Sequence, residues 1–109
     1  MIFVDPGALR TELILELCET GQDTNGGLTE NWSEEAVVMA RIEPVTATSV
    51  FGADQTLESV THRVTLRWRE NIASGMRFTK GARRFNIVTV HDPDERGRYL
   101  VCRVRETGL

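Results

Sequence analysis

A ten-residue segment with a two-residue alternation most constrains what this chain can fold into. Five alternate positions are apolar or histidine: Val60, His62, Val64, Leu66 and Trp68. The positions between them are polar, and three of these are arginines: Arg63, Arg67 and Arg69. A period of two is typical of a β-strand with one buried face and one solvated face. The segment therefore predicts a strand whose solvated face is basic and whose other face places Trp68 in the core.

The residues that follow predict more strands with short connections. Residues 76–79 and 84–90 flank a tight reversal at Gly81, where glycine supplies the positive φ of a hairpin turn. Residues 99–105 form the last strand, and Phe85 and Ile87 are predicted core anchors. This succession predicts a mainly β fold, a small antiparallel β-barrel or sandwich with one or two short helical segments and long loops.

The first half is less strongly patterned. Asp5-Pro6 favours a helical turn near residues 6–10. In residues 9–18 the leucines alternate as in a strand, whereas Leu and Glu favour helix by propensity. We expect a strand over residues 11–19, with a helix as the open alternative. Trp32 is expected to anchor the returning chain in the core, before a strand over residues 36–43 that Pro44 ends.

Two polar segments predict loops. Residues 20–30 predict a flexible hairpin loop, whose candidate flexible residues are Asp23, Asn25, Gly26 and Gly27. Residues 46–59 predict either a short helix or a long exposed loop, because their few apolar residues are poorly spaced for an amphipathic helix.

Charge is divided unevenly along the chain. Residues 1–59 have two basic and eleven acidic side chains, whereas residues 60–109 have eleven basic and five acidic ones. The net charge of −3 thus combines −9 in the first half with +6 in the second. This asymmetry favours a charged partner or self-association through opposite faces, unless the two halves intermix in the fold and neutralise each other.

The sequence has no pattern typical of an enzyme. At 109 residues we expect one domain over residues 1–109, too small for a deep two-domain cleft. No phosphate-binding loop, zinc-protease or serine-hydrolase motif is present. His91 precedes an Asp-Pro-Asp turn rather than a metal motif, and Cys18 and Cys102 are expected to be free thiols. We predict no catalytic residue, cofactor, metal, membrane span or signal peptide.

The basic strand leaves nucleic-acid binding as an alternative function. Arginines on one strand face suit phosphate groups, and a small barrel with a basic strand is similar to single-strand binders of the OB type. Such binders interleave exposed aromatics with the charges, whereas alternation places Trp68 on the opposite face. Aromatic content is only 6% and the net charge is negative. Nucleic-acid binding is therefore the weaker prediction.

An ordered set of short motifs covers nearly the whole chain. They are GALR at residues 7–10, ARIEP at 40–44, THRVTLRWR at 61–69, MRF at 76–78, RFNI at 84–87 and DPDER at 92–96. In this order the motifs resemble those of the phage head–tail joining family, which includes head–tail adaptors and stoppers. The resemblance implies a structural protein of a tailed phage, a prophage or a gene transfer agent, rather than an enzyme.

The resemblance also implies partners and a location. Members of the family assemble as rings below the portal and its adaptor, connect the capsid to the tail, and in some cases close the DNA channel. We accordingly expect contacts with portal or adaptor proteins, with tail proteins and with copies of the chain in a cyclic ring. DNA is expected to pass through the lumen without sequence-specific binding. Assembly is expected in the bacterial cytoplasm, and the final place is the head–tail interface.

Two groups of candidate site residues follow. A ring needs two complementary patches on each subunit, which an acidic and an arginine-rich surface can provide. The candidate interface residues are Arg41, Glu43, Arg63, Arg67 and Arg69. By resemblance, the segment after the IEP motif corresponds to a loop that projects into the channel in the family's stoppers. Its candidate channel residues are Thr46, Thr48, Ser49, Val50, Phe51, Asp54 and Gln55.

Overall fold

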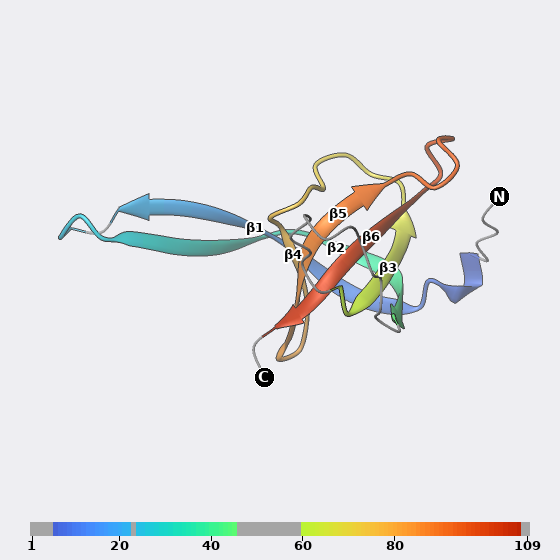
Figure 1. Cartoon of the computed structure of the whole chain (residues 1–109), viewed down its shortest axis with the longest axis horizontal. Coiled ribbons are helices and arrows are strands. Elements are labelled where there is room, and N and C mark those ends of the chain that lie inside the picture. The colour runs from blue at the N-terminus through green and yellow to red at the C-terminus, as the bar shows by residue number, and fades with distance from the viewer. Residues whose placement is uncertain (1–5, 23, 46–59, 108–109) are drawn as a thin grey trace, which may run out of the picture.

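Six antiparallel strands close into a barrel in the computed structural model, which describes residues 6–22, 24–45 and 60–107 (Figure 1). The strands are β1 (Thr11–Gln22), β2 (Leu28–Pro44), β3 (His62–Arg67), β4 (Arg77–Lys80), β5 (Arg83–His91) and β6 (Tyr99–Thr107), after a 3-10 turn at Pro6–Ala8. Their order around the barrel is β1-β2-β3-β6-β5-β4, and β4 closes the barrel on β1. The prediction of a mainly β fold with a small antiparallel barrel is confirmed.

The core fills the barrel with the inward side chains of every strand, as alternation requires. The largest fully buried side chains are Phe78, Phe85, Leu13, Leu15, Leu66, Val64, Val104 and Cys102. Ile87 is also buried, so both Phe85 and Ile87 are core residues as predicted. The predicted hairpin between β4 and β5 is present, with Gly81 at a φ of 59° in its turn.

The hairpin of β1 and β2 is longer than predicted. The predicted hairpin is present, but β1 continues to Gln22 and β2 begins at Leu28, so the expected extent of its loop, residues 20–30, is wrong. The polar side chains there occupy the two solvated faces of a ribbon whose backbones pair with each other. Of the four candidate loop residues, Asn25, Gly26 and Gly27 are in the connection, and Asp23 lies outside the described residues. Residues 11–18 form a strand rather than the alternative helix.

A β-bulge in β2 decides the direction of Trp32. The pairing with β1 slips after Leu15, so that Glu35 is an extra residue in β2. On the barrel side of the bulge, the even-numbered Val38 and Ala40 point inward and are buried. The extra residue shifts this alternation by one position, which turns Trp32 away from the core. The prediction of Trp32 as a core anchor is therefore wrong.

β3 ends one residue too early for Trp68 to enter the core. Its pairing with β6 stops at Arg67, and Trp68 is 45% exposed. The Trp68 backbone N–H instead donates to the carbonyl of Arg98 at 2.9 Å. Trp68 is thus not a core anchor, because the alternation in the sequence extends beyond the residues that pair as a strand. Inside the strand the alternation does hold, since Val64 and Leu66 are buried.

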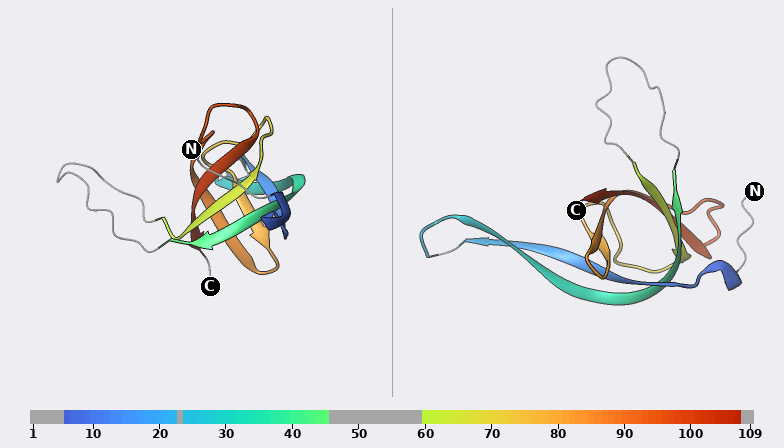
Figure 2. Two further views of the ribbon diagram at one scale, coloured as in Figure 1. Left: turned by 90° about the vertical axis from the view of Figure 1, so that its right-hand side faces the viewer. Right: turned by 90° about the horizontal axis from the view of Figure 1, so that it is seen from below.

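Beyond the barrel, β1 and β2 continue as a projecting two-stranded arm, formed by residues 17–22 and 28–35 (Figures 1 and 2). β4 pairs with β1 only at residues 14–16, and β3 pairs with β2 only from residue 40 onward. Within the described residues, the arm strands therefore pair only with each other. Its six residue pairs from Leu17 outward extend about 20 Å. An isolated two-stranded ribbon is only marginally stable in water, so contacts at the base of the arm matter.

Candidate partner interface

Five arginines lie on the outward face of three adjacent strands, β2, β3 and β6. Alternate residues of these strands are buried in the core, so the residues between them face outward. The register aligns Glu43 of β2, Arg63 of β3 and Arg103 of β6 in one row across the barrel. We call this surface the basic wall, and it consists of Arg41, Arg63, Arg67, Arg103 and Arg105.

Glu43 binds two arginines of the basic wall. Its Oε2 atom lies 3.1 Å from Nη2 of Arg41, and its Oε1 atom lies 3.2 Å from Nη2 of Arg63. Both arginine side chains are about half exposed, so each pair stabilises the fold by at most about 1 kcal/mol. Three residues predicted as interface candidates thus form one cluster, whose net charge is positive.

The other two predicted interface residues lie apart from this cluster. Arg67 is exposed on the basic wall, at the opposite end of β3 from Arg63. Arg69 follows the strand, and its Nε atom donates to the backbone carbonyl of Glu70 at 3.2 Å. Sequence reasoning missed Arg103 and Arg105, although both alternate with the buried residues of the last strand. Within the described part of the chain, Arg67, Arg103 and Arg105 form no ion pair.

The two charged halves of the sequence intermix only in part. Two ion pairs join an acidic residue of the first half to an arginine of the second, Glu43 to Arg63 and Glu16 to Arg77. The acidic residues of the arm, by contrast, form no ion pair with any described residue: they are Glu19, Glu30, Glu34 and Glu35. The arm has no basic residue of its own. An acidic surface and a basic surface therefore remain on the same subunit.

Trp32, Arg77 and Glu16 fasten the base of the arm. Nε of Arg77 donates a hydrogen bond to Oε1 of Glu16 at 2.6 Å. The guanidinium carbon of Arg77 lies 3.9 Å from the centroid of the Trp32 ring. The side chains of Arg77 and Glu16 are only 15% and 19% exposed, so partial desolvation strengthens both contacts. Because these residues come from β2, β4 and β1, they tie the arm to the barrel, and we call them the Arg77 cluster.

The segment with the candidate channel residues leaves and re-enters the barrel at one point. The N–H of Val45 donates to the carbonyl of Thr61 at 2.9 Å, and the N–H of Thr61 donates to the carbonyl of Val104 at 2.9 Å. Oγ1 of Thr61 accepts a further hydrogen bond from the N–H of Glu106 at 2.7 Å. The candidate channel residues lie outside the described residues: Thr46, Thr48, Ser49, Val50, Phe51, Asp54 and Gln55. Their role stays a prediction.

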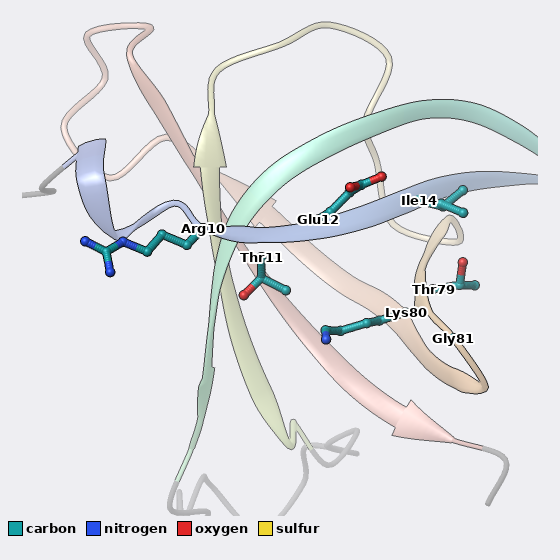
Figure 3. Close-up of a pocket in the computed structure, with 7 residues that line it drawn as sticks. All are labelled: Arg10, Thr11, Glu12, Ile14, Thr79, Lys80 and Gly81. Atoms are coloured by element: carbon teal, nitrogen blue, oxygen red, sulfur yellow. The ribbon is translucent and has the colours of Figure 1, made fainter.

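A shallow hollow of about 400 Å³ lies between the start of β1 and the β4–β5 turn. It is lined by Arg10, Thr11, Glu12, Ile14, Thr79, Lys80 and Gly81. The charged ends of Arg10, Glu12 and Lys80 point in different directions rather than toward one point (Figure 3). The lining of the hollow includes two threonine hydroxyls and the Lys80 amine, but no ion pair or hydrogen bond among the described residues joins these groups to Glu12. A hydrolytic or group-transfer site needs a nucleophile in contact with a base.

The titratable groups fit structural roles. Burial raises the pKa of the Cys102 thiol to about 12, which makes it a poor nucleophile. Oδ1 and Oδ2 of Asp92 accept hydrogen bonds from the backbone N–H groups of Asp94 and Gly97, at 3.3 and 2.7 Å, as in the predicted turn.

Among the described residues, no three His, Cys, Asp or Glu side chains gather to hold a metal. No helix in the described part of the chain is long and apolar enough to cross a membrane.

Comparison with known protein families shows to which family the chain belongs. The family model for the phage head completion protein matches residues 4–107, which include the whole barrel and the arm. The chain belongs to this family. The resemblance to phage head–tail joining proteins in the sequence is thereby confirmed. Family members are structural phage proteins, and nothing in the comparisons supports the alternative of a nucleic-acid-binding barrel. The sequence argument that Trp68 lies on the buried face no longer counts against nucleic-acid binding, because Trp68 is exposed beside Arg67. The comparisons therefore decide between the two functions.

Solved structures share the fold of this head completion protein. A chain from the virion of a native gene transfer agent particle is 27% identical and has a TM-score of 0.69. The match covers 91% of this chain and 96% of that one. Protein SF1141 from Shigella flexneri 2a is 21% identical with a TM-score of 0.66, over 93% of this chain and 96% of its own. The second similarity shows the fold alone. No curated protein sequence matches the chain.

Proposed function

We propose that this head completion protein joins the capsid to the tail of a phage or phage-like particle, as a structural component of the head–tail junction. The observation that supports this most is the family match over residues 4–107, together with the gene transfer agent virion chain of the same fold. The absence of converging catalytic groups around the described hollow agrees with a structural role.

The proposal includes a ring of identical subunits between the portal or adaptor proteins and the tail proteins. A closed ring needs two different complementary patches on each subunit. The acidic arm and the basic wall are two such patches, on separate parts of the molecule. The ring forms in the bacterial cytoplasm during assembly and stays at the junction in the finished particle.

DNA passes through the ring in this proposal without sequence-specific binding. A lumen lined by many arginines would hold DNA through phosphate contacts and slow its passage. The net charge of −3 is compatible with a channel that DNA can leave. The arginines of the basic wall are therefore assigned to contacts between proteins rather than to the lumen.

Deletion of the gene in the producing cell tests the proposed function. Cells without the chain should accumulate separate filled heads and separate tails, and expression of the chain from a plasmid should restore joined particles. Electron microscopy of the lysates measures the ratio of joined to separate particles. Normal numbers of joined particles without the chain would contradict the proposal.

A further inference from the structure

We infer that the arm of one subunit packs on the basic wall of a neighbouring copy of the same chain, in a head-to-tail contact. This inference rests on the proposed ring and names the two surfaces that close it. The arm is formed by residues 17–22 and 28–35, and the basic wall consists of Arg41, Arg63, Arg67, Arg103 and Arg105.

The arm has the properties of a surface that is completed by a partner. Leu28 near its tip is 84% exposed and Leu17 is 37% exposed. Both long edges of the arm have backbone groups that pair with no other described strand. The Arg77 cluster nevertheless holds the arm in one direction, away from the barrel (Figure 1). A projecting ribbon that is fixed at its base and apolar near its tip is suited to contact another molecule.

Charge identifies the kind of partner. The arm has four acidic side chains without a described ion pair, and no basic side chain. The basic wall has Arg67, Arg103 and Arg105 without a described ion pair, and Glu43 is shared between its other two arginines. Glu30 and Glu34 alternate with Leu28 on one face of the arm, whereas Glu19 lies on the other face. Contact of the Leu28 face with the basic wall would pair Glu30 and Glu34 with arginines that have no described ion pair.

The apolar side chains of the two surfaces also correspond. On the outward face of β2, Val37 and Met39 are 52% and 48% exposed, and Arg41 follows at the next outward position. Ile14 of β1 aligns with Val37 and extends this apolar strip. On the arm, the exposed Leu28 lies on the same face of β2 as Glu30 and Glu34. An arm that sets its acids against the arginines can therefore place Leu28 on the strip beside them.

Other occupants fit these observations less well. The acidic arm would be repelled by the phosphates of DNA. A symmetric contact of arm with arm would bring like charges together. The arm cannot fold back onto the basic wall of its own subunit, because the Arg77 cluster holds the arm away from the barrel. In a head-to-tail ring, in contrast, every subunit offers one arm and receives one.

Cysteine cross-linking in assembled particles tests the contact. The experiment uses Leu28→Cys and Met39→Cys, together and singly, in a Cys18→Ser background, with a short bismaleimide reagent. Both new cysteines replace exposed side chains, so folding should be unaffected. We expect the double variant to give a ladder of cross-linked oligomers, and each single variant to give none. Dimers of the Leu28→Cys variant alone would overturn the inference in favour of an arm-to-arm contact. A cross-link from Leu28→Cys to a different particle protein would also overturn it.

Charge exchange provides a second test that does not depend on a reagent. An arm variant, Glu30→Arg with Glu34→Arg, and a wall variant, Arg67→Glu with Arg103→Glu, should each lower incorporation into particles at least tenfold. Co-expression of the two variants should restore incorporation, because each arm then meets a wall of opposite charge. Failure of co-expression to restore incorporation would overturn the inference.

The two tests separate this inference from the proposed function. Particles that contain the chain at the head–tail junction, but give no cross-link between its copies, would overturn only the arm-to-wall contact. Particles that join heads to tails without the chain would overturn the proposed function itself.

Discussion

The barrel and the arm are made from the same two strands, yet they are held in place by different means. In the barrel, β1 and β2 have neighbours on both sides, and their inward side chains Leu13, Leu15 and Ala40 are fully buried. In the arm, the same strands pair only with each other among the described residues, and Leu28 is 84% exposed. Burial stabilises the barrel within one chain, whereas the arm depends on the Arg77 cluster at its base.

This difference suggests that the barrel determines the stability of the subunit and that the arm acts in assembly. Substitutions in the barrel should change the free energy of unfolding of the single subunit. Substitutions near the tip of the arm should leave that free energy almost unchanged and act on assembly instead. Paired substitutions, one in each region, can therefore separate the stability of the barrel from that of the arm.

The largest difference is expected between the two cysteines. Cys18 is partly exposed on the arm, whereas Cys102 is fully buried and its pKa is raised to about 12 by burial. A maleimide reagent should label Cys18 in the native protein and label Cys102 at least about 10³-fold more slowly, because Cys102 needs opening of the barrel. Mass spectrometry of the labelled peptides measures both rates. In denaturant the two rates should converge, and equal rates in the native protein would show that the barrel opens as readily as the arm.

Removal of a core aromatic should have the next largest effect. Phe78→Ala leaves a cavity at a fully buried position of β4 and should lower the free energy of unfolding by about 3–5 kcal/mol. The matched arm substitution Leu28→Ala should change it by less than about 0.5 kcal/mol. Urea denaturation of the isolated subunit gives both values. Comparable losses in the two variants would mean that the arm is part of the folded core.

The parts of the barrel that could be predicted are those in which apolar and polar residues alternate along the sequence. The strand over residues 62–67, the Gly81 hairpin and the last strand show regular two-residue patterns, so their inward residues, including Phe85, were predicted correctly. The arm was missed because both of its faces are polar, and a strand with two solvated faces has no apolar period. Trp32 was misplaced because one extra residue, Glu35, shifts the alternation and is not visible in the sequence.

The candidate interface was predictable only along single strands. Arg63 and Arg67 were found because they alternate within one segment, and their outward direction is confirmed by the exposure of both. Arg103 joins them only through the register between β3 and β6, which sets Arg63 opposite Arg103. Pairing between strands that are distant in sequence is not specified by the pattern of either strand alone.

The Arg77 cluster should have an intermediate effect that is confined to the arm. Arg77→Ala removes the ion pair with Glu16 and the contact with the Trp32 ring. We expect the free energy of local opening of the arm to fall by about 1 kcal/mol, measured as faster amide hydrogen exchange in residues 17–22 and 28–35. Exchange in β6 should be nearly unchanged. Arg84→Ala is a suitable control, since Arg84 is exposed and forms no ion pair with a described residue. A uniform increase in exchange over the whole chain would contradict this assignment.

The smallest effect concerns an ion pair at the rim of the barrel, which depends on pH. The hydrogen bond from Arg83 to Glu106, at 2.7 Å, holds the pKa of Glu106 below its ordinary value. A carboxyl with a lowered pKa in the folded state stabilises it above the ordinary pKa and loses this contribution as the pH falls through the lowered value. Glu106→Gln should therefore lower the Tm slightly at neutral pH and leave it unchanged at a pH below the lowered pKa, where Glu106 is protonated in the folded and the unfolded state. Arg83→Gln should show the same dependence, and a Tm difference that persists in acid would contradict the mechanism.

The hydrogen bond between Val45 and Thr61 has a consequence for how such junction proteins diversify. The chain leaves the barrel at one of these residues and returns at the other, and the hydrogen bond holds these two points of the barrel side by side. The entropy cost of closing a flexible connection rises slowly, by about 0.6 kcal/mol for each doubling of its length. A lineage can therefore trim, lengthen or exchange the intervening residues to match a new neighbouring protein while the barrel keeps its fold.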